Sequence, residues 1–324
     1  MFENLIAALK ADKRKIVFTE GPDARILEAA ARLKKDGLMD SILVGNVDEV
    51  KAAAAKGGFD IEGMEIIDPA TYPEMDAMVA KMVELRKGKM SEEDCRAALS
   101  KGNYFGTMLV KMGKADCLLG GATYSTADTV RPALQLIKTK PGNKIVSSCF
   151  IMVRPAASGE NEVLAMADCA INIKPNEDEL VEICKETVSC AKIFGVDPKV
   201  AFLSYSTLGS GKGEDVDKMR NACEKAKALM PDTPIGGEFQ FDAAVSPAVA
   251  KTKHITDAVG GHANTFIFPD INAGNIGYKI AQRLGNFDAY GPILLGLNAP
   301  INDLSRGCNA QEVYSMAIIT AALA

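Results

Sequence analysis

The stretch KIVFTEGPDARILEAAARLKKDGLMDSILVG, residues 15–45, decides the fold class. It begins with a short β-rich run at 15–19, continues at 20–37 with apolar residues at helical spacing, and returns to a second apolar run at 41–45. Pro22 suits the first turn of the expected helix and Gly37 suits its C-terminal cap. Strand, helix and strand in this order predict α/β layers around a parallel sheet.

The same alternation continues along the 324 residues, a length typical of two domains at ~150 residues each. Further strands are expected at 116–121, 144–153, 199–206, 265–270 and 291–297. Helices are expected at 47–58, 73–87, 177–194, 213–229, 275–284 and about 309–324. Short apolar strands that alternate with longer helices predict α/β domains with largely parallel sheets.

Composition excludes several classes of protein. The formal net charge is −5 and the pI is near 5.3, so a general nucleic-acid partner is not expected. The longest uncharged run, 289–302, has about 14 residues, fewer than a membrane span needs. The N-terminus carries Glu3 and no long apolar segment, so we expect no secretory signal and a cytoplasmic protein. The eight cysteines form no C-x-x-C, which argues against zinc and redox sites and for reduced, mostly buried thiols.

Two familiar site types are absent from the sequence. LGSGKG at 208–213 is not a Walker A motif, because Ser206 stands where its first glycine belongs and Gly213 follows the lysine. The loop leaves two readings open, an anion contact at a helix N-terminus or a plain tight connection. Only His254 and His262 are available for a histidine-based triad or metal site, and nothing near them supports either. We therefore expect Arg, Lys, Ser, Tyr and carboxylates to carry the chemistry.

The first candidate segment is GGATYSTADTVRPALQ, residues 120–135. It follows an expected strand and opens a helix, with Ser125 and Thr126 near the helix start. Arg131 precedes Pro132, a position biased away from helical backbone angles. An arginine at a disturbed helix start beside hydroxyl groups suits a phosphate or carboxylate. The alternative is a surface arginine with capping residues.

The second candidate segment is TFIFPDINAGNIGYKIAQR, residues 265–283. Asn272, Gly274 and Asn275 are expected to form a tight loop before a helix that bears Tyr278 and Lys279. Such loops at the carboxyl end of a strand hold ligands in α/β proteins. The alternative is that Asp270 or Asn272 only caps the helix.

The third segment, GPILLGLNAPINDLSRGCNAQEVYSMA at 291–317, places Asp303, Ser305 and Arg306 in one expected loop, with Gly307 for backbone freedom. Asn309-x-x-Glu312 matches a capping box at the start of the last helix. Glu312 is therefore either a cap or a catalytic carboxylate.

Five stretches together resemble the phosphate acetyltransferase family, whose close relatives are phosphate butyryltransferases. They are ATYSTADTVRPALQ at 122–135, VAFLSYSTLGS at 200–210, FIFPDINAGNIGYKIAQRL at 266–284, AYGPILLGL at 289–297 and NAPINDLSRG at 298–307. The match at 15–30 is weaker. The resemblance covers essentially the whole chain in order.

This resemblance implies the reaction acetyl-CoA + phosphate = CoA + acetyl phosphate, with CoA as a substrate and no cofactor or metal. It implies a homodimer of two-domain α/β subunits with the active site in the cleft between domains. We place the first domain at 1–142 plus 295–324 and the second at 143–294. A phosphate butyryltransferase is the nearest alternative. A metal- and NAD-dependent decarboxylating dehydrogenase and a non-catalytic acyl-phosphate-binding protein are more distant ones.

The resemblance also implies roles for residues. Ser305 and Arg306 match the reacting centre, and Arg131 and Arg86 match arginines linked to substrate binding. The family's base is an Asp in the turn after the SRG loop, where this chain has Glu312, and Asp303 is the competing carboxylate. Ala157 stands where some relatives have a Cys, so we expect direct transfer in a ternary complex and no acyl-enzyme. The remaining expected substrate-binding residues are Ser125, Thr126, Asn272, Asn275, Tyr278 and Lys279.

Overall fold

The computed structural model describes residues 2–156 and 159–324. The expected departure at Ala157 lies outside these residues. The described chain divides into two compact units, a first unit of 2–141 and 297–324 and a second unit of 142–296. The second unit is therefore an insertion in the first, and each unit is described by itself below.

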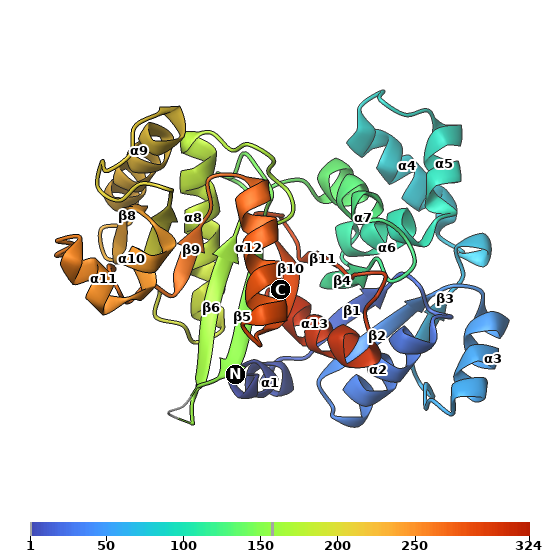
Figure 1. Cartoon of the computed structure of the whole chain (residues 1–324). Helices are drawn as coiled ribbons and strands as arrows, with labels where there is room; N and C mark the ends of the chain where they lie inside the picture. Colours follow the sequence, from blue (N-terminus) through green and yellow to red (C-terminus); the bar gives the residue numbers. More distant parts are fainter. Residues whose placement is uncertain (1, 157–158) are drawn as a thin grey trace. The chain divides into compact units, whose positions relative to one another are not determined.

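The first unit is built on a five-stranded parallel sheet in the order β11-β4-β1-β2-β3. Its strands are β1 (Arg14–Phe18), β2 (Met39–Val44), β3 (Glu65–Ile67), β4 (Cys117–Gly120) and β11 (Ile301–Asp303). Its helices are α1 (Glu3–Ala11), α2 (Ala24–Lys35), α3 (Val47–Gly57), η1 (Pro69–Thr71), α4 (Met75–Arg86), α5 (Glu92–Leu99), α6 (Gly102–Lys111), α7 (Thr126–Pro132), the π-helical turn η2 (Ala133–Ile137) and α13 (Ala310–Ala322). Helix α13 packs on β1 and β4 beside α2, and α6 packs on the same two strands from the other side (Figure 1).

The second unit has a six-stranded sheet in the order β10-β5-β6-β9-β7-β8, parallel from β6 to β8 and antiparallel at β10, β5 and β6. Its strands are β5 (Ser147–Pro155), β6 (Asn161–Ala167), β7 (Val200–Leu203), β8 (Ile235–Phe239), β9 (Thr265–Ile267) and β10 (Asp288–Leu295). Its helices are α8 (Glu177–Ile193), α9 (Glu214–Leu229), α10 (Phe241–Val245), α11 (Pro247–Thr252) and α12 (Ile271–Leu284). Helices α8 and α9 cover one face of the sheet, and α12 packs on β5, β6 and β10 (Figure 1).

The α/β class with largely parallel sheets, predicted from the sequence, is confirmed. Buried apolar side chains of β1, β4, β7 and β9 explain why these strands appear as continuous apolar runs. The start of α2 differs from the prediction. Pro22 precedes the helix, and Asp23 caps it by accepting a hydrogen bond from the Arg25 amide at 2.9 Å. A carboxylate cap fixes this start more strongly than the proline does.

Candidate active site

The carboxyl ends of β11, β4 and β1 lie side by side in the parallel sheet of the first unit. Three loops leave this edge: 19–23 after β1, 121–125 after β4 and 304–309 after β11. Ligands of open α/β sheets bind outside this edge of the strands. Six candidate residues, Asp303, Ser305, Arg306, Glu312, Ser125 and Thr126, belong to the loops or to the ends of the elements they join.

Asp303 is the last residue of β11, and its expected place in a loop is wrong. Three residues, Ile301–Asp303, pair with Leu118–Gly120, a strand too short to stand out as a pattern. Burial raises the pKa of the Asp303 carboxyl, whereas hydrogen bonds and the charge of Arg306 oppose that rise. Its two oxygens accept from the hydroxyls of Thr126 at 2.5 Å and Thr129 at 2.6 Å. Asp303 thus fastens α7 to β11.

Ser305 and Arg306 lie in an exposed turn directly after that buried anchor. The Cys308 amide donates to the Ser305 carbonyl at 2.9 Å, and the Gly307 amide donates to Ser305 Oγ at 3.2 Å. The turn therefore pairs the Ser305 carbonyl and the Gly307 and Cys308 amides internally, while both side chains remain exposed. A hydroxyl and a guanidinium next to each other at this edge can bind an anion and a neighbouring polar group.

Glu312 forms the capping box that its spacing predicts. Its Oε2 accepts from the Asn309 amide at 2.9 Å, and the Glu312 amide donates to Asn309 Oδ1 at 2.9 Å. The carboxylate is exposed in the first turn of α13. The cap is present, and it leaves Oε1 outside this pair of bonds.

Ser125 and Thr126 lie at the start of α7, as expected, but Ser125 Oγ donates to Asp128 Oδ2 at 2.7 Å instead of capping the backbone. The expected disturbance at Arg131 is wrong, because Arg131 lies inside α7. The irregularity follows Pro132, where η2 begins, since proline lacks the amide that an α-helix needs. The Arg131 side chain is 58% exposed, with Nη1 3.9 Å from Asp128.

Arg86 ends α4, and its Nε is buried without a hydrogen-bond partner among the described residues. Burial raises the pKa of Tyr104, and the positive charges of Arg131 and Arg86 oppose this rise. Both guanidinium groups therefore act on the same tyrosine. Two nearby cations, one with an unpaired donor, suit a polyanionic ligand.

The four candidates of the second segment lie in the second unit, and the loop predicted for them is wrong. Helix α12 begins at Ile271, capped by Asp270 Oδ1, which accepts from the Ala273 amide at 3.0 Å. Asn272, Gly274 and Asn275 are helical. A side chain at Gly274 would place its Cβ 2.3 Å from the Asp168 carbonyl, so the glycine permits close packing instead of a turn.

Three of these four side chains have partners within the second unit. Asn275 Nδ2 donates to the Cys169 carbonyl at 2.9 Å, and Lys279 Nζ donates to Asn275 Oδ1 at 2.7 Å. The Tyr278 ring stacks on Phe150 with centroids 3.9 Å apart. Asn272 is exposed. The structure places these residues on one helix and leaves their expected contact with substrate a prediction.

The sequence leaves an anion contact or a tight connection open for the loop after β7, and in the structure part of this loop binds a buried carboxylate. The Gly209 amide donates to Oε1 of Glu238 at 2.7 Å, and Ser206 Oγ donates to the same oxygen at 2.9 Å. Arg220 Nε pairs with the other carboxylate oxygen at 3.2 Å. Glu238 is 1% exposed, so the Gly209 amide and the Ser206 hydroxyl bind a buried carboxylate of the protein itself.

The sequence interpretation missed Glu20, Arg25 and Tyr124. Glu20 accepts from the amides of Gly121 at 3.1 Å and Thr123 at 2.7 Å, and burial raises its pKa. Tyr124 pairs its hydroxyl with that of Thr19 at 2.7 Å. Arg25 donates to all three loops, as detailed below. For Glu20 and Arg25, a signal was present in the sequence: the charged run EGPDAR follows the expected strand at 15–19, and loops that follow strands often carry functional residues.

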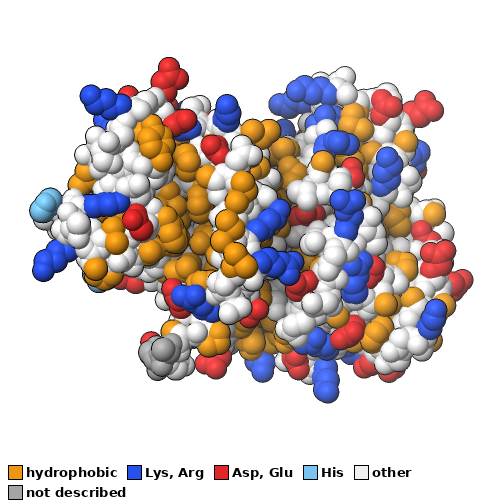
Figure 2. Space-filling model, in the orientation of Figure 1, with side chains coloured by type: hydrophobic (Ala, Val, Ile, Leu, Met, Phe, Trp, Pro, Cys, Tyr) orange, Lys and Arg blue, Asp and Glu red, His pale blue; other side chains and the backbone are white. Residues whose placement is uncertain are grey.

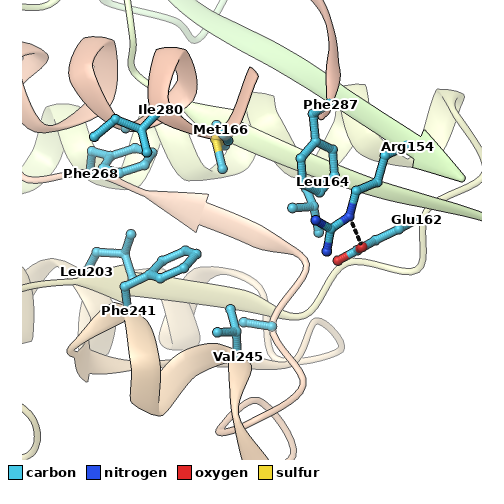
Figure 3. A pocket seen from close by; sticks show the side chains of 13 residues that line it. Arg154, Glu162, Leu164, Met166, Leu203, Phe241, Val245, Phe268, Ile280 and Phe287 are labelled. Carbon is cyan, nitrogen blue, oxygen red and sulfur yellow. Dashed lines mark hydrogen bonds and ion pairs between the residues drawn. The ribbon is translucent and has the colours of Figure 1, made fainter. Parts of the chain in front are cut away.

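The second unit holds an apolar pocket of about 640 Å³ next to α12 (Figure 3). The side chains of Leu203, Phe241 and Val245 face Ile280 and Phe268 across it, and an ion pair of Arg154 and Glu162, 2.6 Å apart, lies at one end. Beside it, Ile276, Ile280 and Leu284 on α12 are 58%, 53% and 80% exposed. Figure 2 shows hydrophobic side chains gathered over this part of the second unit.

Other features concern the whole described chain. All eight cysteine thiols are free and buried. Within residues 2–156 and 159–324 we find no helix with the length and apolar character to span a membrane. The same residues hold no cluster of three His, Cys, Asp or Glu side chains arranged to bind a metal ion.

Comparison with known proteins covers nearly the whole chain. A family model described as phosphate acetyl/butaryl transferase matches residues 1–321. The chain is 53% identical over 310 residues to the phosphate acetyltransferase of Bacillus subtilis, covering 96% of this chain and 94% of that protein. It is 51% identical over 315 residues to the phosphate acetyltransferase of Staphylococcus epidermidis, with the same coverage.

Solved structures of phosphotransacetylases and related proteins have the same fold as this chain. A phosphotransacetylase from Streptococcus pyogenes superposes with a TM-score of 0.94 at 54% identity, over 99% of this chain and 97% of that one. A branched-chain phosphotransacylase from Enterococcus faecalis shares the fold with a TM-score of 0.66 at 21% identity, covering 96% and 99%. A putative 4-hydroxythreonine-4-phosphate dehydrogenase from Salmonella typhimurium also shares the fold, with a TM-score of 0.55 at 14% identity, covering 96% and 100%.

Proposed function

Because this chain belongs to the phosphate acetyl/butyryl transferase family and is an acyltransferase, we propose that it moves an acetyl group between CoA and inorganic phosphate. The substrates are acetyl-CoA and phosphate in one direction, and CoA and acetyl phosphate in the other. The observation that carries this proposal is the exposed Ser305–Arg306 turn at the end of β11, in a chain about half identical to phosphate acetyltransferases over its whole length. The dehydrogenase alternative shares only the fold.

The chemistry needs an orienting anion site and a proton acceptor. Only a few per cent of a thiol with pKa ~8.5 is ionised at pH 7, so the CoA thiol must lose its proton as it attacks the acetyl carbonyl. Ser305 donates a hydrogen bond to the sulfur. Arg306 binds the phosphoryl group and balances its charge as the carbon–oxygen bond to phosphate breaks and the carbon–sulfur bond forms. Arg131 and Arg86 bind the negatively charged parts of the substrates.

Glu312 is the base in this proposal, and Asp303 is the alternative. Asp303 has both oxygens occupied by threonine hydroxyls and is buried, so it is poorly placed to meet a thiol. Glu312 is exposed and uses Oε2 in the cap. The test is Glu312→Gln, which keeps the size and much of the cap, with Asp303→Asn beside it. A large loss of kcat with unchanged melting in Glu312→Gln supports the base, whereas full activity with a lower melting temperature makes it a cap.

We propose direct transfer in a ternary complex, without a protein cofactor. The support is that burial raises the pKa of Cys308, the thiol nearest the Ser305–Arg306 turn. A nucleophilic cysteine needs the opposite shift. Orientation and electrostatics are then sufficient to move the acyl group between bound substrates. Parallel-line initial-velocity plots, or an acetylated protein on the reaction path, would contradict this.

We also propose a cytoplasmic homodimer that acts on small molecules and not on nucleic acid or membranes. Eight free thiols fit a reducing compartment. The row Ile276, Ile280 and Leu284, with the apolar pocket beside it, is a surface that a second copy would cover. Sedimentation of Leu284→Glu tests this: we expect a dimeric wild type and a weakened dimer in the variant. A wild-type monomer would overturn the dimer proposal.

The experiment for the activity itself mixes the protein with acetyl phosphate and CoA and follows thioester absorbance. Butyryl phosphate in a parallel sample tests the butyryl alternative. We expect faster turnover with acetyl phosphate. Faster turnover with butyryl phosphate would make the chain a butyryltransferase, and no thioester with either would leave an acyl-phosphate-binding protein.

A further inference from the structure

Arg25, the second residue of α2, has every guanidinium donor engaged at the carboxyl edge of the first sheet. Nε and Nη2 form a bidentate ion pair with the Asp23 carboxylate, at 3.0 Å and 2.7 Å. The remaining donors reach main-chain carbonyls: Nη2 binds Ala122 at 2.9 Å, and Nη1 binds Arg306 at 2.9 Å and Cys308 at 3.1 Å. One side chain from the first turn of α2 thus contacts the loops after β4 and β11.

The Asp23 carboxylate keeps this guanidinium in one orientation. Asp23 also caps α2 through its own Oδ1, so the pair is anchored to the helix start. Hydrogen bonds from the Arg25 side chain lower the pKa of Asp23, although burial opposes this. A planar fork with five fixed donors can meet two carboxylate oxygens and three carbonyls at once, whereas the single ammonium of a lysine cannot.

We propose that Arg25 is a positioning residue of the transfer reaction, which acts through the backbone of Arg306. The carbonyl that Arg25 holds belongs to the residue whose side chain, in the proposed function, binds the phosphate group of acetyl phosphate. Arg25 itself does not touch substrate in this scheme. The inference rests on the proposed function, because it assigns Arg25 to the same site.

Geometry explains why this contact matters for rate. The loop that carries the exposed Ser305–Arg306 turn is joined to the end of β4 at its start, where the Leu304 amide donates to the Gly120 carbonyl at 2.7 Å. At the turn itself, Arg25 binds the carbonyls of Arg306 and Cys308 and connects them to the Ala122 carbonyl of the loop after β4. A misplacement of about 1 Å in a group that orients substrate can cost ~100-fold in rate. A fixed Arg306 backbone therefore determines how well the guanidinium meets the transition state.

The test compares Arg25→Lys with Arg32→Lys as a matched control. Arg32 lies on the same helix, donates to Gln311 at 2.6 Å and stacks on Tyr314 at 4.4 Å, and both of these partners are on α13, outside the three loops. Both variants are made in the wild-type and Arg306→Ala backgrounds. The readouts are kcat and KM for acetyl phosphate and CoA, the melting temperature, and amide hydrogen exchange of residues 303–309.

We expect Arg25→Lys to lower kcat at least tenfold, to change KM for CoA less than threefold and to speed exchange in 303–309. In the Arg306→Ala background the same change should cost less than threefold, since two residues acting as a unit are not additive. Arg32→Lys should change kcat less than twofold in both backgrounds. Equal losses from Arg25→Lys in both backgrounds, or unchanged exchange and activity, would overturn the proposal. A wild type without acetyl transfer would refute the proposed function instead, and the exchange measurement would still test the Arg25 contact.

Discussion

The loop after β11 and the loop after β7 share features of sequence and differ in structure. Both follow a short buried strand, and both carry a basic residue beside a glycine, Arg306 in one and Lys212 in the other. The β7 loop has three serines and three glycines, and the β11 loop has one of each. The β7 loop aims its amide and hydroxyl donors inward at buried Glu238. The β11 loop has its buried carboxylate, Asp303, one residue before it and presents Ser305 and Arg306 to solvent.

The difference teaches that a polar, glycine-rich loop at a strand end marks a site only if its donors remain available. In the second unit the buried carboxylate of Glu238 accepts hydrogen bonds from the loop itself. In the first unit the threonines of α7 bind the buried carboxylate of Asp303, and the side chain of Arg306 stays exposed. The location of the buried carboxylate therefore distinguishes the two loops.

The largest effect expected from this comparison is that of Arg306→Ala. Loss of a charge-assisted contact made in the transition state costs about 3 kcal/mol, or ~100-fold in kcat. The protein should stay folded, because the Arg306 side chain is exposed. Steady-state kinetics with acetyl phosphate and CoA measure kcat, and a melting curve measures whether the variant stays folded. Near-normal kcat would remove Arg306 from the mechanism.

The matching change in the other loop, Glu238→Gln, should reduce stability and spare the chemistry. An amide in place of the carboxylate loses the charge-assisted bond to Arg220, at about 2 kcal/mol of unfolding free energy. Burial opposes ionisation of Glu238, but bonds from Gly209, Ser206 and Arg220 hold its pKa below the ordinary 4.5. The stabilisation is therefore full above pH 4.5 and is lost as the pH falls through the lower pKa of the folded protein.

Denaturant unfolding of Glu238→Gln and of the wild type, at pH 7 and at lower pH, tests whether the ionised Glu238 carboxylate stabilises the fold. The difference in unfolding free energy should be greatest at pH 7 and should shrink in acid, while kcat at pH 7 stays within a factor of two. A large fall in kcat with unchanged stability would show that the β7 loop has a catalytic role after all.

Arg131→Ala should have a smaller effect, on binding instead of turnover. The side chain is exposed and only loosely paired with Asp128, so its removal costs little stability. We expect KM for a phosphate-bearing substrate to rise about tenfold, equivalent to about 1.4 kcal/mol. Substrate saturation curves for CoA and acetyl phosphate show which of the two is affected. An unchanged KM for both would return Arg131 to a structural role.

The smallest effect is expected from Cys308→Ala. The thiol is buried beside Arg25, with Sγ 3.7 Å from Nη1, and burial raises its pKa. The proposed mechanism uses Arg306 and no protein thiolate, so kcat should stay within about twofold of the wild type. Loss of activity comparable with that of Arg306→Ala, in a variant that melts normally, would point to a covalent role for this cysteine.

The parts of the fold that the sequence predicts correctly are those with local patterns. Apolar runs gave β1, β2, β4, β7 and β9, and helical periodicity gave α8 and α9. The errors arise where long-range contacts override local preference. Gly274 and its neighbouring asparagines favour a loop, yet they are helical, and Gly274 lets α12 pack closely on the Asp168 carbonyl. Strand β11 has three residues and exists through its pairing with β4.

In the candidate site too, the sequence predicts local relations between residues and does not predict long-range contacts. Ser305, Arg306 and the capping box of Glu312 could be predicted from one segment, since their relations are local. The contacts of Thr126 with Asp303 and of Arg25 with Arg306 join residues 177 and 281 positions apart. No periodicity or spacing reports such contacts. The buried state of Asp303, and with it the weaker case for that residue as a base, therefore emerged only from the structure.

The insertion of the second unit between Pro141 and Leu297 has a consequence for synthesis. The two ends of the insertion meet in the first unit, where Thr139 pairs with Leu297 and the Asn298 amide donates to the Lys138 carbonyl at 2.9 Å. Closing a chain loop costs only ~0.6 kcal/mol for each doubling of its length, so a whole folded unit is tolerated there. On a ribosome the second unit emerges before β11. The nascent chain therefore has no Ser305–Arg306 turn until every other strand of both sheets has been translated.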